Sequence, residues 1–459
     1  MALEVVGKRA LKYDGMSHIT GQSRYVDDIL IPGTLTVKAF RSPVHKGRMK
    51  SIDTSKAENM PGVAGVITYR DVPHNAYGME PDQPVLVEKD IRYKGEPIAA
   101  VAAINEKVAY AALDRIVVDI EEEEPVFDPL KAMEPDAPKV RPEGNVYMFG
   151  SEPFKKVYIG DIDEGFRKAD HIIEETYFYP DMEHSALETQ VSLAVPEAMG
   201  KLTIYTVSQA RNFHLGMLAG ILKLGGDALQ CECINEWSGK TRSSWRGKTG
   251  MNRVRLEGYA VGGGFGGKNE LHADHITALL ALKTARPCKW RWTREEELLY
   301  STHRGPWYVT IKDGVMNDGR IIARYVKSIH DGGAYIGFNA YAAGKFSYFV
   351  NGPYYVPNLR CEGYCVFTNK PVASTMRGFA VAPGTFAVEV QMHKIAEKLG
   401  MDPWELRFKN AILKGDQLVT RQVMKDPSLV ETMQALAKRA GVTLPDHLMR
   451  MTSESNQRI

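Results

Sequence analysis

A glycine-rich segment, VGGGFGGK at residues 261–268, constrains the fold of this chain more than any other feature. It stands between a strand-like segment, NRVRLEGYA, and a helical pattern that begins near Leu271. Five glycines around Phe265 let the backbone approach a ligand closely and direct successive N–H groups at an anion. We therefore expect a site for an anionic or oxygen-rich ligand between a strand and a helix. A tight turn without a ligand is the alternative.

Residues 262–268 also satisfy the first seven positions of a phosphate-binding P-loop. Asn269 stands where that motif carries the Ser or Thr that holds a magnesium ion. The sequence therefore disfavours a nucleoside triphosphatase.

A second glycine-containing loop, ASTMRGFAVAPG at residues 373–384, lies between a predicted strand, CVFTN, and a predicted helix. Arg377 and Phe379 flank Gly378 and offer a cation and an aromatic plane from one turn. Such a pair could bind a planar ring. A surface arginine beside a core phenylalanine is the alternative interpretation.

Composition excludes several classes of protein. At 459 residues and 44% hydrophobic content, the chain can form two or three domains with buried cores. Its net charge of +2 gives no field that would attract nucleic acid. Because no apolar run of about 18 residues and no signal peptide are present, we predict a cytoplasmic protein without a membrane span. The five cysteines lack ferredoxin spacing, so we expect reduced thiols and no iron–sulfur cluster on this chain.

The order of helical and strand patterns predicts a mixed α/β (α+β) protein. Residues 15–128 alternate short apolar runs with helical segments and predict a small α/β domain. The proline-containing stretch 129–151 is interpreted as a linker, residues 152–415 as a second domain and residues 416–459 as a polar tail. Within the second domain, residues 225–250 are interpreted as an inserted surface loop. Its basic residues could instead contact a partner subunit or an anionic cofactor.

The two glycine loops, in this order, belong to a larger set of motifs. GQSRYVDDI, FRSPVHKGRMKSID and GVAGVITYRDV precede GDIDEGFRKADHIIEETY, VGGGFGGK, MRGFAVAPGTFAVE and MDPWELRFKNAI. This ordered set resembles the xanthine dehydrogenase family of molybdenum hydroxylases over roughly residues 15–415. The resemblance implies an α/β hammerhead domain followed by the first molybdopterin-binding domain of that family.

The resemblance also implies a cofactor site. Gln209 corresponds to a glutamine that hydrogen-bonds an oxo ligand of molybdenum, which makes it the expected catalytic residue on this chain. The pterin dithiolene would hold the metal, and no side chain of this chain would ligate it. Main-chain groups would line the cofactor, together with Gln209, at Gly263, Gly264, Phe265, Gly266, Met376 and Arg377.

Two further positions are implied for the substrate. Phe379 corresponds to an aromatic residue that faces the substrate. Lys345 falls where xanthine-oxidising members carry an arginine, and a lysine keeps the charge but loses the planar guanidinium. For Lys345, an exposed lysine without this role is an equally weighted alternative.

Departures from the family pattern limit the substrate. Asn269 replaces a glutamate of purine-oxidising relatives, and the loop around Met376 lacks the copper-binding cysteine of carbon monoxide dehydrogenases. Neither purines nor carbon monoxide are therefore expected as substrates.

The GQG-type and GVGE-type loops of the family's second molybdopterin-binding domain do not occur in this sequence. The family's catalytic glutamate lies in that domain, so we expect a second molybdopterin subunit to supply it. The chain most resembles the split nicotinate dehydrogenases. That resemblance implies molybdopterin, in its cytosine dinucleotide form, on this chain, with [2Fe-2S] and FAD on partner subunits.

Three functions remain open at this point. The first is water-dependent hydroxylation of an electron-poor carbon in an aza-heterocycle such as nicotinate. The second is a subunit of an aldehyde or aromatic acyl-CoA oxidoreductase of the same family. The third is a non-catalytic cofactor-binding or maturation protein.

Overall fold

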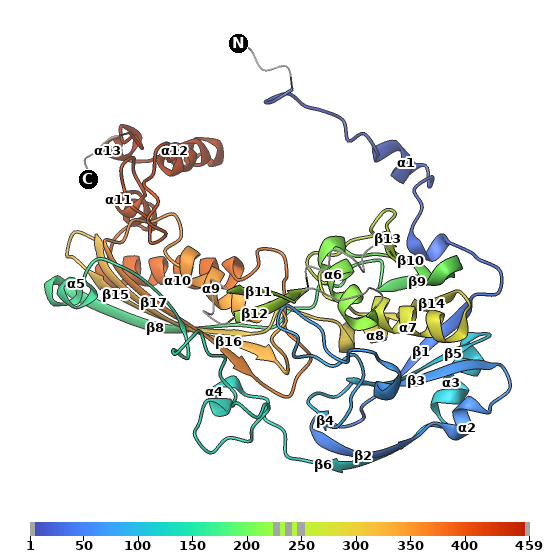
Figure 1. Ribbon diagram of the computed structural model, residues 1–459. Helices are drawn as coiled ribbons and strands as arrows, with labels where there is room; N and C mark the ends of the chain where they lie inside the picture. The colour runs from blue at the N-terminus through green and yellow to red at the C-terminus, as the bar shows by residue number, and fades with distance from the viewer. Residues whose placement is uncertain (1–4, 224–229, 235–240, 246–252, 455–459) are drawn as a thin grey trace.

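Two large β-sheets and a smaller one organise the chain (Figure 1). The computed structural model describes residues 5–223, 230–234, 241–245 and 253–454. The seven-stranded sheet has the order β13 (Val254–Glu257), β10 (Lys201–Thr206), β9 (Val191–Glu197), β14 (Cys288–Arg291), β1 (Leu35–Arg41), β5 (Pro97–Ala103) and β3 (Val63–Thr68). The five-stranded sheet has the order β7 (Lys155–Ile159), β17 (Asn358–Phe367), β16 (Ile321–Gly333), β15 (Trp307–Val315) and β8 (His171–Tyr179). The predicted mixture of helices and strands is confirmed.

The first unit contributes three strands to the seven-stranded sheet and also forms a sheet of its own. That smaller sheet joins β4 (Asp90–Ile91), β2 (Gly47–Asp53) and β6 (Val117–Glu122). Helices α2 (Ser55–Glu58) and α3 (Glu106–Leu113) lie beside β3, β1 and β5. Strand β1 pairs with β14 in parallel, at Leu35 with Cys288 and Thr36 with Lys289. The two sequence-predicted domains therefore share one continuous sheet, which short apolar runs far apart in sequence could not reveal.

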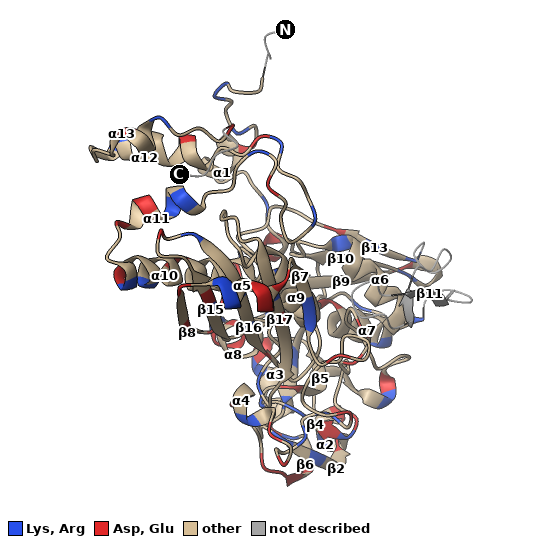
Figure 2. Cartoon of the chain, turned by 90° about the vertical axis from the view of Figure 1, so that its left-hand side faces the viewer, with Lys and Arg blue, Asp and Glu red and all other residues tan. Residues whose placement is uncertain are grey.

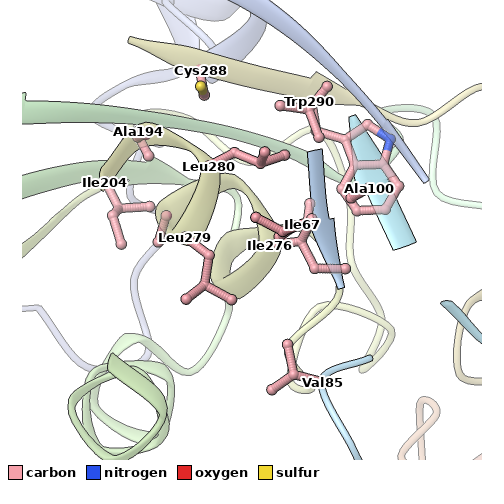
Figure 3. Close-up of a cluster of buried hydrophobic side chains, with 14 of the residues drawn as sticks. Ile67, Val85, Ala100, Ala194, Ile204, Ile276, Leu279, Leu280, Cys288 and Trp290 are labelled. Carbon is pink, nitrogen blue, oxygen red and sulfur yellow. The ribbon is translucent and has the colours of Figure 1, made fainter. Parts of the chain in front are cut away.

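Helix α7 (Asp274–Thr284) packs under this shared sheet and closes its core. Figure 3 shows Ile276, Leu279 and Leu280 of the helix among side chains from the sheet, including Ala194, Ile204 and Trp290. Ile276 and Leu280 are fully buried. Burying each such side chain contributes about 1.5 to 3 kcal/mol. Because α7 begins a few residues after the glycine-rich segment, this core positions the segment.

The five-stranded sheet carries helices α9 (Asn339–Phe349) and α10 (Val381–Leu399) on one face (Figure 1). Helix α5 (Ile162–Lys168) contacts β15, β16 and β17. Across β15 and β16, the paired residues Asp313 and Arg324 form a fully buried ion pair, with Nε···Oδ1 at 2.7 Å and Nη2···Oδ2 at 3.0 Å. The sheet thus gives α9 and α10 a rigid support.

Helix α11 (Pro403–Asn410) begins as its sequence predicts. The Asp402 carboxylate accepts hydrogen bonds from the N–H groups of Trp404 and Glu405, at 2.8 and 3.1 Å. Pro403 occupies the first turn, where no N–H is needed.

The C-terminal residues differ from the predicted polar tail. Helices α12 (Leu429–Ala440) and α13 (Asp446–Met449) form a small unit with α11 (Figure 1). Val430, Met433 and Leu448 are buried against Phe408 of α11. The overall polarity of this segment hid a narrow apolar stripe, because only one face of α12 is buried.

Residues 129–151 are likewise more ordered than a linker. They contain the short helix α4 (Pro129–Ala132), and Val140, Tyr147 and Phe149 are buried against the five-stranded sheet. An isolated bridge pairs Val146 with Val366 of β17. The prolines therefore mark a change of direction rather than an exposed connection.

The predicted insertion at residues 225–250 is described only in part. Strands β11 (Gln230–Ile234) and β12 (Thr241–Trp245) pair antiparallel, and helix α6 (Arg211–Leu222) precedes them. The basic residues proposed as contacts, Lys240, Arg246 and Lys248, lie outside the described residues, as does the rest of the segment. Within the described part of the chain, no helix is long and apolar enough to cross a membrane. Figure 2 shows acidic and basic residues interspersed along the elements.

Candidate cofactor site

The glycine-rich segment forms a loop whose shape is held by Gln209. The Gln209 Oε1 atom accepts hydrogen bonds from the N–H groups of Gly266, at 2.9 Å, and Lys268, at 3.3 Å. The Gln209 N–H in turn donates to the Lys268 carbonyl at 2.9 Å. Phe265 has a positive φ of 51°, which costs a non-glycine residue about 1 to 2 kcal/mol. These hydrogen bonds on the following residues hold that conformation.

Glycine is required at Gly264 and Gly266 for steric reasons. A Cβ atom at Gly264 would lie 2.4 Å from Gln209 Oε1. At Gly266, where φ is 110°, it would lie 2.4 Å from the Thr375 carbonyl oxygen. The loop is therefore packed tightly between Gln209 and the second glycine loop.

Lys268 does not serve as a phosphate ligand. Its side chain is 1% exposed, and its Nζ atom donates to Glu188 Oε2 at 2.7 Å. The same Glu188 oxygen accepts the Gly262 N–H at 2.8 Å. The lysine thus closes the loop from inside, in agreement with the departure from the P-loop pattern at Asn269.

The two glycine loops lie against each other. The Arg377 N–H donates to the Phe265 carbonyl at 2.8 Å, and Thr375 Oγ1 donates to the Gly266 carbonyl at 2.9 Å. The Asn269 Nδ2 group donates to Thr375 Oγ1 at 2.9 Å. Segments about 110 residues apart in sequence, whose proximity the motif order predicts, therefore form one structure.

Arg304 holds the second loop from behind. Its guanidinium is almost fully buried, and its Nη2 group donates to the carbonyls of Met376, at 3.2 Å, and Arg377. Its Nη1 group donates to the Tyr179 hydroxyl at 2.9 Å. With their carbonyls engaged in this way, Met376 and Arg377 have defined backbone positions next to Phe265.

The outer side of the paired loops is accessible. Phe265 is 46% exposed, and the side chains of Gln209 and Arg377 are exposed as well. Within the described residues, the N–H groups of Gly263, Gly264 and Phe265 form no hydrogen bond. Gln209 Oε1 is used by the loop, which leaves the Nε2 group as a donor. Several unpaired donors on one exposed turn fit an oxygen-rich, anionic group such as the pyranopterin cofactor.

Lys345 and Phe379 meet beside this surface. Lys345 lies on α9, and Phe379 precedes α10. The Lys345 Nζ atom lies 5.5 Å from the centre of the Phe379 ring, within the range of a cation–π contact. The cation predicted to accompany Phe379 was Arg377, but Lys345 provides the contact because Phe379 packs inward and Arg377 outward.

Several residues that shape the site escaped sequence analysis. Glu188, Thr375 and Arg304 come from three separate segments and carry no motif of their own. Only their contacts with the loops identify them. In the described part of the chain, no group of three or more His, Cys, Asp or Glu side chains could hold a metal ion.

Comparison with protein-family models assigns both units. Residues 20–124 match the aldehyde oxidase and xanthine dehydrogenase a/b hammerhead domain. Residues 142–235 and 245–411 match the molybdopterin cofactor-binding domain. The site described above lies within the second match.

Individual relatives agree with the family models. The chain is 38% identical to one of the probable xanthine dehydrogenase subunits of Bacillus subtilis, over 86% of this chain and 50% of that protein. It is 32% identical to the nicotinate dehydrogenase large molybdopterin subunit of Eubacterium barkeri, over 95% of this chain and 96% of that protein.

A solved structure of aldehyde oxidoreductase from Desulfovibrio gigas superimposes with a TM-score of 0.82 at 29% identity, covering 93% of this chain and 46% of that one. The chain thus spans about half the length of some relatives and nearly all of another. On these matches, together with the paired loops around Phe265 and Arg377, the chain belongs to the xanthine dehydrogenase family of molybdenum hydroxylases.

Proposed function

We propose that this chain is the molybdopterin-binding subunit of a multi-subunit hydroxylase that acts on an electron-poor carbon of an aza-heterocycle such as nicotinate. One observation carries the proposal: the Arg377 N–H bonds the Phe265 carbonyl and brings both glycine loops and Gln209 to one accessible surface. When bound, the cofactor supplies the redox chemistry that transfers an oxygen atom from water to the substrate and removes two electrons.

The residues of this chain have separate roles in the proposal. The N–H groups of Gly263, Gly264, Phe265 and Gly266, with the main chain of Met376 and Arg377, line the cofactor. The Gln209 Nε2 group donates a hydrogen bond to it. Gln209 is therefore the catalytic residue that this chain contributes, and its Oε1 atom keeps the loop in place at the same time.

Substrate recognition is assigned to Phe379 and Lys345. An aromatic face next to an ammonium group suits a flat ring that carries a carboxylate. The relationship to a nicotinate dehydrogenase subunit of nearly equal length supports this substrate class. The aldehyde oxidoreductase relative keeps an aldehyde as the second candidate.

Proton removal is assigned to a second molybdopterin subunit. The described residues that face the paired loops include no exposed carboxylate in contact with Gln209. We propose that the partner contributes a glutamate, and that further subunits carry [2Fe-2S] and FAD to take the electrons away. The cytosine dinucleotide form of molybdopterin and the cytoplasmic location remain predictions.

Purification of the native complex tests the proposal. We expect molybdenum, a pterin, a second pterin-binding chain and iron–sulfur and flavin chains to purify together. The complex should oxidise nicotinate or a related carboxylated heterocycle faster than purines or aldehydes. Faster oxidation of an aldehyde would select the second candidate, and a chain that purifies alone without metal would support a maturation protein instead.

A pair of Gln209 variants separates its two roles. Gln209→Glu keeps an oxygen for the Gly266 and Lys268 N–H groups but removes the Nε2 donor, whereas Gln209→Ala removes both. We expect Gln209→Glu to retain the cofactor and to slow turnover about a hundredfold, in line with loss of a single transition-state donor. Wild-type turnover in Gln209→Glu would exclude Gln209 from the reaction.

A further inference from the structure

A small cavity of about 30 Å³ lies behind the two glycine loops. Arg41, Tyr77 and Tyr93 of the first unit line one side, and Glu270, His272 and His275 line the other. It touches the loops directly, because the ring Nε2 of His272 lies 3.2 Å from the Gly267 carbonyl oxygen. The cavity thus separates the hammerhead unit from the cofactor loops.

Polar atoms around this cavity lack partners. Within the described residues, both ring nitrogens of His275 and the Nε and Nη2 atoms of Arg41 are buried without a hydrogen bond. His275 is 1% exposed. Buried polar groups of this kind are normally satisfied by water or by an ion. A water molecule needs about 10 to 15 Å³ of such space, so the cavity can hold about two.

Glu270 connects the cavity to the second glycine loop. Its carboxyl group is buried, and its Oε1 atom accepts a hydrogen bond from Ser374 Oγ at 2.8 Å. The preceding Asn269 bonds Thr375. Two successive side chains after the first glycine loop therefore bind two successive side chains of the second loop. A Cβ atom on Gly337 would lie 3.0 Å from Glu270 Oε1, so Glu270 also lies against the segment that leads into α9.

We propose that Glu270 is a positioning residue that sets the second glycine loop and the start of α9 relative to the first loop, and that water in this cavity connects it to the hammerhead unit. Through these elements Glu270 fixes the places of Arg377, Phe379 and Lys345. The consequence for turnover rests on the proposed function, whereas the consequence for loop order does not.

The protonation state of Glu270 matters for this role. Burial raises the pKa of Glu270 to about 7, and the Ser374 hydrogen bond lowers it by less than burial raises it. Below pH 7 the neutral acid can accept from Ser374 with one oxygen and donate to cavity water with the other. A glutamine has the same arrangement of acceptor and donor. The titratable or charged groups that face Glu270 or share the cavity are Arg41, Tyr77, Asp82, Tyr93, His214, His272 and His275.

Hydrogen–deuterium exchange of the full-length chain tests the positioning role. Glu270→Ala removes the acceptor, and Ser374→Ala removes only the donor, which guards against a Glu270→Ala chain that fails to fold. We expect both variants to raise amide exchange in residues 373–384 about tenfold at pH 6, as loss of one buried hydrogen bond would. Glu270→Gln should stay within about threefold of wild type.

Glu96→Gln is the matched control. Glu96 is also a buried glutamate, and its Oε1 atom accepts a hydrogen bond from the Tyr335 hydroxyl. Because Glu96 bonds neither glycine loop, we expect Glu96→Gln to leave exchange in residues 373–384 unchanged. Unchanged exchange in folded Ser374→Ala and in any folded Glu270→Ala protein would overturn the proposal.

Two further measurements complete the test. A high-resolution crystal structure should show about two waters bonded to Arg41 or His275, and an empty cavity would overturn the water connection. In the assembled complex, Glu270→Gln should flatten the dependence of KM on pH between 6 and 8. Absence of turnover in the wild-type complex, with exchange changed as expected, would instead refute only the proposed function.

Discussion

Replacing Gly266 by alanine tests whether the close approach of the two glycine loops builds the cofactor site. The new Cβ atom would lie 2.4 Å from the Thr375 carbonyl oxygen, and φ at this position is 110°. Unfavourable φ costs about 1 to 3 kcal/mol. Moving Thr375 away would also weaken its hydrogen bond to the Gly266 carbonyl and the neighbouring bond from Arg377 to Phe265, at about 1 kcal/mol each. We expect a local cost of about 3 to 5 kcal/mol.

Molybdenum content per chain and exchange in residues 261–268 report that cost. Gly200→Ala is the matched control, because Gly200 has a φ of 68° and open space where its Cβ would lie. The control carries conformational strain without the clash. We expect Gly266→Ala to lose most of its molybdenum and to exchange at least tenfold faster, and Gly200→Ala to resemble the wild type. Equal metal content in both variants would refute the reasoning.

Three further predictions concern stability and substrate binding. Asp313→Asn leaves the buried Arg324 guanidinium without its counter-ion and should lower the unfolding free energy by about 3 to 5 kcal/mol in urea, whereas a loss below about 1 kcal/mol would contradict a structural ion pair. Burial raises the pKa of Glu96 from 4.5 to about 7, so its neutral form stabilises the fold fully below pH 4.5, and this stabilisation is lost as pH rises through 7. Glu96→Gln should therefore raise stability at pH 8.5 by up to about 3 kcal/mol and change little at pH 4.5; equal effects at both pH values would argue against a titrating Glu96. Lys345→Gln should raise KM for a carboxylated ring about tenfold with kcat nearly unchanged, and an unaltered KM would remove Lys345 from the substrate site.

Much of the local structure was predictable because its causes are local. The N-cap at Asp402, helix α7 after the glycine-rich segment and strand β16 all follow from periodicity and turn chemistry within a dozen residues. The meeting of the glycine loops was inferred through the resemblance of motif order to a known family. Spacing alone could not place Phe265 beside Arg377.

The remaining features depend on contacts that sequence patterns do not encode. The continuous sheet forms where β1 pairs with β14, some 250 residues later in the chain. Lys268 looked like a phosphate ligand by position, but Glu188, from a segment without a motif, neutralises it inside the fold. The packed unit around α12 was missed because a single apolar stripe on a charged helix barely changes the average polarity of its segment.

The central claim is that the loops around Phe265 and Arg377 hold one pterin-bound molybdenum whose proton acceptor belongs to another polypeptide. A structure of the complex purified from its native host tests this claim most directly. We predict cofactor density against the N–H groups of Gly263, Gly264 and Phe265, with Gln209 on one side and a carboxylate from a second chain opposite. Cofactor density elsewhere, or paired loops covered by protein that leaves no room for a cofactor, would contradict it.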